Sequence, residues 1–102
     1  ASLLSFFGRN NIKIVEQHCL KKRTEYDFVL KLPSGVGELT YYCKAKAKKK
    51  VAESDVSAAY VQGQLRKLPV LLLSPGELAK KAQELVERDL KGLTFKQMEG
   101  EP

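Results

Sequence analysis

The chain has 102 residues and carries 18 Lys and Arg against 12 Asp and Glu, a formal net charge of +6. Its 43% hydrophobic and 29% charged residues are typical of a globular domain, and this length suffices for one core without disulfide or metal staples. Two cysteines, Cys19 and Cys43, exclude a disulfide scaffold and a four-cysteine zinc site. The longest apolar run, 70–73, is too short to cross a bilayer, so no membrane insertion is expected.

The two ends of the sequence also support predictions about localisation and domain organisation. The apolar start lacks a preceding basic region, so no signal peptide is predicted and we expect an intracellular protein, cytoplasmic or nuclear. The chain begins at Ala1 rather than Met, which favours a piece of a longer protein. We expect one domain over 1–96, followed by a polar tail over 97–102.

In the first half, a short apolar segment precedes three predicted strands. Residues 1–7 are typical of the last turn of a helix that Gly8 ends. Alternation of apolar and polar residues then predicts half-buried strands. These strands are expected over 11–20, 24–32 and 38–46. A turn over 33–37 joins the second to the third, so an antiparallel meander is predicted, with Tyr42, Lys44 and Lys46 on its outward face.

The second half alternates helix and strand. A stripe through Val56 and Ala59 predicts a helix over 53–68, with Gly63 packed closely on a sheet. The apolar run 69–73 predicts a strand buried on both faces, and 74–77 reads as a capping box that opens a second helix. The fold class is therefore α/β (α+β), a mixed central sheet of about four strands in the order (α)-β-β-β-α-β-α, with helices flanking the sheet.

The positive charge is concentrated in the first half of the chain. Residues 1–50 hold eleven Lys and Arg against four acids, a net +7, whereas residues 51–102 hold seven bases and eight acids, a net −1. A basic surface attracts polyanions, although a solvated lysine-rich surface that only keeps the protein soluble is the alternative. The candidate phosphate contacts are Lys21, Lys22, Arg23, Lys44, Lys46, Lys48, Lys49 and Lys50. If the third strand continued, Lys44 to Lys50 would form a row with no acid between residues 39 and 52.

The element order, with segments 26–30 and 38–46, resembles the PD-(D/E)xK restriction-endonuclease-like superfamily over roughly residues 3–75. The likeness is greatest to Holliday-junction resolvases and to restriction endonucleases of modified DNA. The resemblance implies an Asp on the second strand, here Asp27, and a (D/E/Q)-x-K on the third. In the family these residues bind Mg²⁺, which activates water against a phosphodiester.

The sequence departs from that motif at its acid. If Lys44 is the motif lysine, the position of the motif acid holds Tyr42. If Lys46 is the motif lysine, the position of the motif acid holds Lys44. Asp27, Glu38, Lys44 and Lys46 are therefore relict candidates rather than a confident catalytic set, with Glu38 able to contribute only by a slipped register. No metal site and no cofactor is predicted, and Mg²⁺ enters only if the chain is an active nuclease.

Three functions are weighed. The first is a nucleic-acid-binding domain with a degenerate, non-catalytic nuclease-like fold that contacts nucleic acid, DNA rather than RNA, with low sequence specificity. The second is a protein-interaction or assembly module of a larger protein, which would use an apolar patch at Leu3, Leu4, Phe6 and Phe7. The third is an active Mg²⁺-dependent nuclease. Resemblance to resolvases, which are dimers, implies a possible homodimer; other domains of the full-length protein are the other expected partners.

Several of these residues could instead have purely structural roles. Asp27 could pair with Lys44 or Lys46 across neighbouring strands. The single histidine, His18, is expected to be structural or exposed, and both cysteines are expected to be buried free thiols.

Overall fold

The computed structural model describes residues 2–22 and 24–98. Along the chain it contains three helices and seven strands in the described residues. They are α1 (Ser2–Arg9), β1 (Lys13–Lys21), β2 (Glu25–Ser34), β3 (Gly37–Lys46), β4 (Lys50–Val51), α2 (Glu53–Arg66), β5 (Val70–Ser74), β6 (Glu77–Leu78), α3 (Lys80–Asp89) and β7 (Leu93–Gln97).

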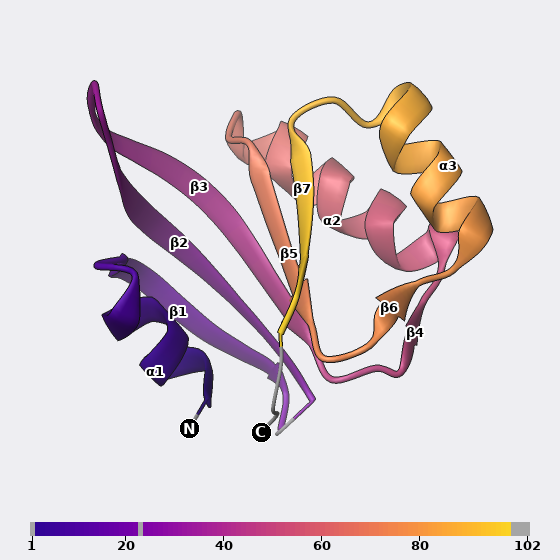
Figure 1. Cartoon of the computed structure of the whole chain (residues 1–102), viewed down its shortest axis with the longest axis horizontal. Coiled ribbons are helices and arrows are strands. Elements are labelled where there is room, and N and C mark those ends of the chain that lie inside the picture. The colour runs from indigo at the N-terminus through magenta and orange to yellow at the C-terminus, as the bar shows by residue number, and fades with distance from the viewer. Residues whose placement is uncertain (1, 23, 99–102) are drawn as a thin grey trace.

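A five-stranded mixed sheet forms the centre of the fold, in the order β1-β2-β3-β5-β7. The first three strands are an antiparallel meander, and β5 and β7 run parallel to β3 (Figure 1). Strands β4 and β6 pair separately as a short parallel ribbon beside the sheet. The α/β class with helices flanking a mixed sheet is thus confirmed.

Each face of the sheet carries its own core. Helices α2 and α3 cover one face, where Tyr42, Val56 and Leu72 are fully buried (Figure 1). The short helix α1 packs on the other face, where Phe7 contacts Phe28 edge-on with ring centroids 5.1 Å apart. Because successive strand residues point to opposite faces, β3 supplies both cores.

The helix α2 lies close to β5, as Gly63 predicted. A Cβ at this position would clash with the side chain of Val70 and lie 2.9 Å from the carbonyl oxygen of Leu68. Glycine therefore sets how closely α2 packs on the sheet, at a local cost of about 1 kcal/mol relative to alanine in a helix. Strand β5 is almost wholly buried, with Leu72 and Leu73 at 0% and 1% exposure.

Three predicted boundaries are wrong. Ser74 ends β5 instead of capping a helix. Its hydroxyl donates a hydrogen bond to the carbonyl of Lys48 and accepts one from the N–H of Gly76. Helix α3 begins later, after Ala79. Gly8 does not end the first helix, since α1 continues to Arg9. The strand over 93–97, the fifth of the central sheet, was not predicted; its last residue, Gln97, and Met98, which packs into the α1-side core, fall in the predicted tail. Residues 99–102 of that tail lie outside the described part of the chain. None of the described helices has the length and apolar character that a bilayer-spanning segment needs.

Candidate nucleic-acid interface

Asp27, the candidate relict metal ligand, is buried at 6% exposure on the α2 side of the sheet. Its Oδ1 lies 3.0 Å from Nδ1 of His18 on β1, and its Oδ2 accepts a hydrogen bond of 3.1 Å from the hydroxyl of Tyr42 on β3. An ionised carboxylate only accepts, so Nδ1 of His18 carries the proton in this pair. The guanidinium of Arg66, from α2, covers the Tyr42 ring at 4.7 Å.

Tyr42 therefore lies beside the carboxylate, where the resemblance implies a second acid. Burial and the neighbouring Asp27 carboxylate raise the pKa of Tyr42, so its hydroxyl stays a neutral donor. Both oxygens of Asp27 already accept hydrogen bonds, and the described residues contain no group of three His, Cys, Asp or Glu arranged to hold a metal ion. This donor set does not fit Mg²⁺, which needs several oxygen ligands with compensating charge.

The lysines of β3 face the same side but are already paired. Lys44 is opposite Asp27 in the strand register, yet its ammonium contacts Glu25 at 3.0 Å. The whole Lys44 residue is only 8% exposed. Lys46 lies 3.8 Å from the same carboxylate. Burial alone would raise the pKa of Glu25, but the two lysines outweigh it and hold that pKa below its usual value. The alternative that Asp27 pairs with Lys44 or Lys46 is therefore wrong, since both lysines contact other carboxylates. The side chain of Lys44 points inward because α2 covers this face of β3.

Asp55, in the first turn of α2, organises the end of β3. Its carboxylate accepts hydrogen bonds from Lys46 at 2.8 Å, from Lys48 at 2.7 Å and from the backbone N–H of Ala52 at 2.8 Å. Burial works against its ionised form, but the two ammonium groups and the N–H lower the pKa of Asp55 to about 2. No local pattern in the sequence places this acid against lysines on the preceding strand, so it was not among the candidate site residues.

The predicted lysine row is consequently not continuous. Strand β3 ends at Lys46, and Lys50 begins β4, where its ammonium lies 3.3 Å from Glu77. The acids that balance these lysines come from β2, α2 and β6 rather than from residues 39–52. Gly76 fixes the segment further, because a Cβ there would clash with the backbone of Lys48 and Lys49.

A cluster of exposed amines remains at one end of the sheet. The N–H of Ala47 donates to the carbonyl of Thr24 at 2.8 Å, so the segment after β3 lies against the turn between β1 and β2 (Figure 1). We call this surface the basic edge. Its exposed members are Lys21, Lys22, Lys48, Lys49 and Lys50. The parallel strands β3 and β5 end beside it, which is where ligands commonly bind open α/β sheets.

The basic edge contains amines of two kinds. Lys48 and Lys50 are tethered to carboxylates, although their side chains are 45% and 61% exposed. Among the described residues, no carboxylate lies within 4.0 Å of the ammonium of Lys21, Lys22 or Lys49. These three amines are therefore the ones most available to a phosphate.

Other candidate residues lie elsewhere. Glu38 pairs with Lys13 at 3.0 Å and is opposite Pro33, so it is six residues, or about 20 Å, along β3 from Lys44. Its proposed slip toward Asp27 is wrong. Cys43 is buried as expected, but Cys19 is exposed on the edge strand β1. Arg23 lies outside the described residues.

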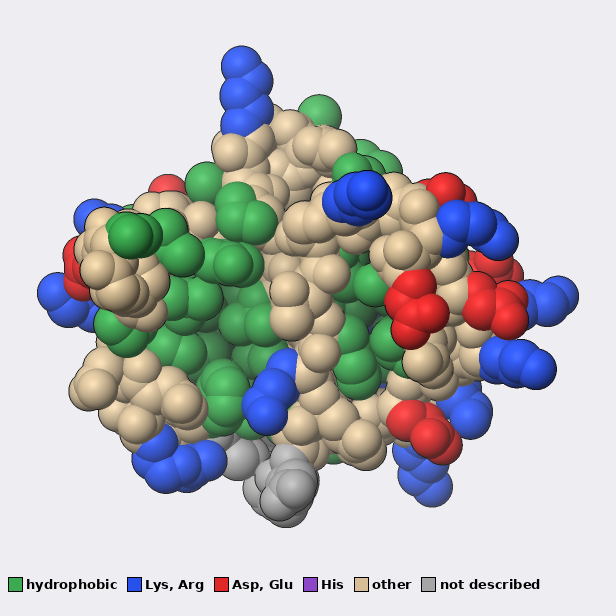
Figure 2. Space-filling view, turned by 45° about the horizontal axis from the view of Figure 1, so that its top comes forward, with side chains coloured by type: hydrophobic (Ala, Val, Ile, Leu, Met, Phe, Trp, Pro, Cys, Tyr) green, Lys and Arg blue, Asp and Glu red, His purple; other side chains and the backbone are tan. Residues whose placement is uncertain are grey.

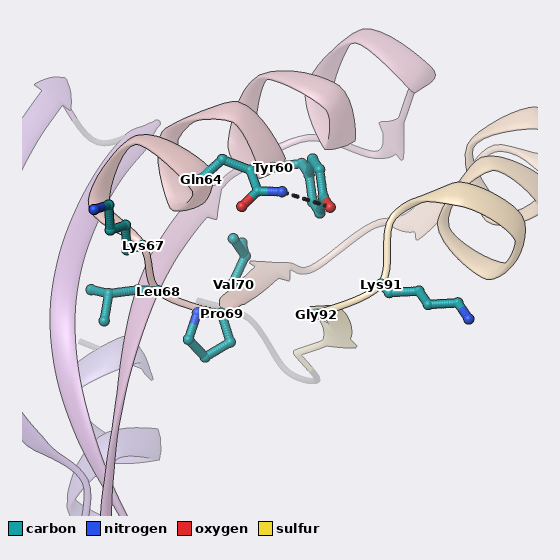
Figure 3. A pocket seen from close by; sticks show the side chains of 8 residues that line it. All are labelled: Tyr60, Gln64, Lys67, Leu68, Pro69, Val70, Lys91 and Gly92. Atoms are coloured by element: carbon teal, nitrogen blue, oxygen red, sulfur yellow. Dashed lines mark hydrogen bonds between the residues drawn. The ribbon is translucent and has the colours of Figure 1, made fainter.

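A hollow of about 370 Å³ lies at the opposite end of β5, below the last turns of α2 (Figure 3). Tyr60 and Gln64 form one wall, joined by a hydrogen bond of 2.8 Å, and Val70 points toward them from below. The side chains of Lys67 and Lys91 point away from this space (Figure 3). None of the residues that line the hollow is a candidate phosphate contact or a relict catalytic candidate.

Comparison with protein-family models, with curated proteins and with solved structures found no match for this chain. The resemblance to the PD-(D/E)xK superfamily therefore stays a prediction. It depends on the order of elements and on the sequence segments 26–30 and 38–46.

Proposed function

We propose that this domain binds nucleic acid through the basic edge and does not cleave it. The observation that carries the proposal is the hydrogen bond between Ala47 and Thr24, which joins two basic segments far apart in the sequence into one surface. Within residues 2–22 and 24–98, no carboxylate lies within 4.0 Å of the ammonium groups of Lys21, Lys22 and Lys49. Lys48 and Lys50 extend the same surface. Regularly spaced phosphates are the ligands that such a surface attracts.

The mode of binding is backbone contact rather than base reading. Lysine is a flexible point charge, and contacts to phosphates set the position of a protein on nucleic acid without reading its sequence. The lysines at 48–50 belong to a segment held by Asp55, Ser74 and Gly76, so little ordering is needed on binding. We therefore expect weak sequence preference and strong dependence on salt.

The absence of cleavage is proposed from the residues around Asp27. A Mg²⁺-dependent nuclease needs carboxylate oxygens free to bind the ion, whereas His18 and Tyr42 occupy both oxygens of this carboxylate. Two neighbouring acids on this side, Glu25 and Asp55, hold lysines. Tyr42 and His18 satisfy a buried carboxylate that would otherwise lack partners.

A salt titration tests the proposal. The dissociation constant for a fluorescent 20-base-pair duplex is measured between about 30 and 200 mM salt for the parent and for the triple variant Lys21→Ala, Lys22→Ala and Lys49→Ala. If three to five phosphates are contacted, log K falls with log salt at a slope of roughly −3 to −4.5. The triple variant should flatten that slope by about two to three units, equally for unrelated sequences.

The matched control removes the same charge elsewhere. Lys31, Lys67 and Lys91 are exposed and lie toward the opposite ends of β2 and β5 from the basic edge. Their replacement by alanine should leave most of the affinity and the slope intact. No measurable binding by the parent at low salt, or equal losses in both triple variants, would contradict the proposed interface. Mg²⁺-dependent cutting lost in Asp27→Ala would contradict the non-catalytic assignment.

A further inference from the structure

The two faces of the sheet are covered unequally. Helices α2 and α3 cover one face with 14 and 10 residues, whereas α1, with 8 residues, covers the other. Figure 2 shows apolar side chains gathered as a hollowed area between α1 and β7, whose places are seen in Figure 1. We call this area the apolar trough. Its half-buried members are Leu3, Phe6, Tyr26, Leu32, Leu71 and Met98.

Two exposed leucines lie on the elements that contribute to the trough. Leu4 on α1 is 53% exposed, and Leu39, which is opposite Leu32 on the same face, is 43% exposed. A contiguous apolar area that remains open to solvent is the signature of a surface that another molecule covers. The area adjoins a well-formed core, so its shape is set by Phe28 and Leu73 beneath it rather than by loops.

The charge around the trough identifies the kind of partner. Helix α1 contains no acid, and the positions of β2, β3, β5 and β7 that share this face contain none either. Two bases lie at its margins: Arg9 ends α1, and Lys96 on β7 is exposed opposite Leu73. In the described residues, a second copy would bring the same two bases and no acid to this face, so charge there favours an acidic partner over self-association.

We propose that the apolar trough binds one amphipathic helix of another protein, with an apolar stripe flanked by Asp and Glu. Leucine-like side chains at i, i+3 or i+4 and i+7 would fill the trough, which is the helix-in-groove mode of recognition. The flanking carboxylates would meet Arg9 and Lys96. This inference does not depend on the basic edge, which is built from other residues.

A synthetic helix tests it. The probe is a fluorescent amphipathic peptide of about 16 residues with a leucine stripe and flanking glutamates, and its comparator has every glutamate replaced by lysine. The full chain should bind the acidic peptide saturably and the basic one at least about tenfold more weakly. The double variant Leu4→Ser and Leu39→Ser, and separately Lys96→Glu, should each weaken binding of the acidic peptide by about tenfold or more.

The matched control is Leu65→Ser, since Leu65 is 73% exposed on α2, on the other side of the sheet. The Leu65→Ser variant should bind the acidic peptide as tightly as the parent does. The triple variant at Lys21, Lys22 and Lys49 should also bind it like the parent, and this result would separate the inference from the nucleic-acid proposal. Circular dichroism confirms that each variant is folded. No saturable binding, equal binding of both peptides, or self-association of the parent that Leu4→Ser and Leu39→Ser abolish would overturn the inference.

Discussion

Replacing Asp55 should expose how the lysines at the end of β3 are held. The carboxylate of Asp55 accepts from Lys46, Lys48 and the N–H of Ala52. In Asp55→Asn the amide oxygen can still accept from Ala52, but the charge that faces the two ammonium groups is lost. Lys46 then keeps a longer contact with Glu25, at 3.8 Å, and Lys48 keeps no described carboxylate.

The size of the effect follows from the pKa. Lowering the pKa of Asp55 from 3.8 to about 2 means that the folded state favours the carboxylate. Each unit corresponds to about 1.4 kcal/mol, so the ionised group contributes about 2 kcal/mol to the free energy of unfolding at pH 7. Because the folded pKa is the lower one, this stability is present above about pH 4 and is lost as pH falls toward about 2.

The contribution of Asp55 is measured by urea unfolding of the parent and of Asp55→Asn at several pH values between 7 and 2. Circular dichroism monitors the unfolding. The free energies of unfolding should differ by about 2 kcal/mol at pH 7, and the difference should close as the pH falls from about 4 to about 2. The control is Glu53→Gln, an exposed acid in the same helical turn, which should cost under about 1 kcal/mol. Equal stability at pH 7, or a difference that persists at pH 2, would refute the reasoning.

Three further substitutions test the packing by urea unfolding at pH 7. Gly63→Ala should destabilise by about 1–3 kcal/mol because the added methyl meets Val70, and a rise in stability would show that α2 does not lie this close to β5. Leu72→Ala should cost about 2–5 kcal/mol, since Leu72 is fully buried in the central strand, and an unchanged midpoint would disprove that placement. Tyr42→Phe should cost about 1–3 kcal/mol by leaving an oxygen of Asp27 without its donor, whereas no loss would mean that water replaces the hydroxyl freely.

Much of the fold could be predicted from local patterns. Period-two alternation located the meander, and the apolar run at 70–73 identified the buried strand parallel to β3. Gly63 predicted close packing because a glycine in a helix interior needs a compensating contact. Strand β7 was missed although Leu93 to Lys96 alternate apolar and polar residues, because the run is only five residues long and its burial depends on pairing with β5.

The site could be predicted only in part, because its electrostatics depend on residues distant in sequence. The expectation that Lys44 points outward followed from alternation along β3, but α2 covers that face and Glu25 meets the ammonium there. Similarly, no pattern in the sequence places Asp55 against Lys46 and Lys48. The pairing of Asp27 with His18 required the β1–β2 register, which the bulges in that pair of strands obscure.

The most direct test of the proposed interface is a backbone amide NMR titration of the ¹⁵N-labelled chain with a short duplex at low salt. The largest chemical-shift changes should fall on residues 21–22 and 47–50, with smaller ones at Thr24 and Ser74, which contact those segments. They should vanish together when salt is raised, because phosphate contacts dominate such binding. Shifts concentrated on α1 and the apolar trough, around the hollow at Tyr60, or nowhere, would contradict the claim that the basic edge binds nucleic acid.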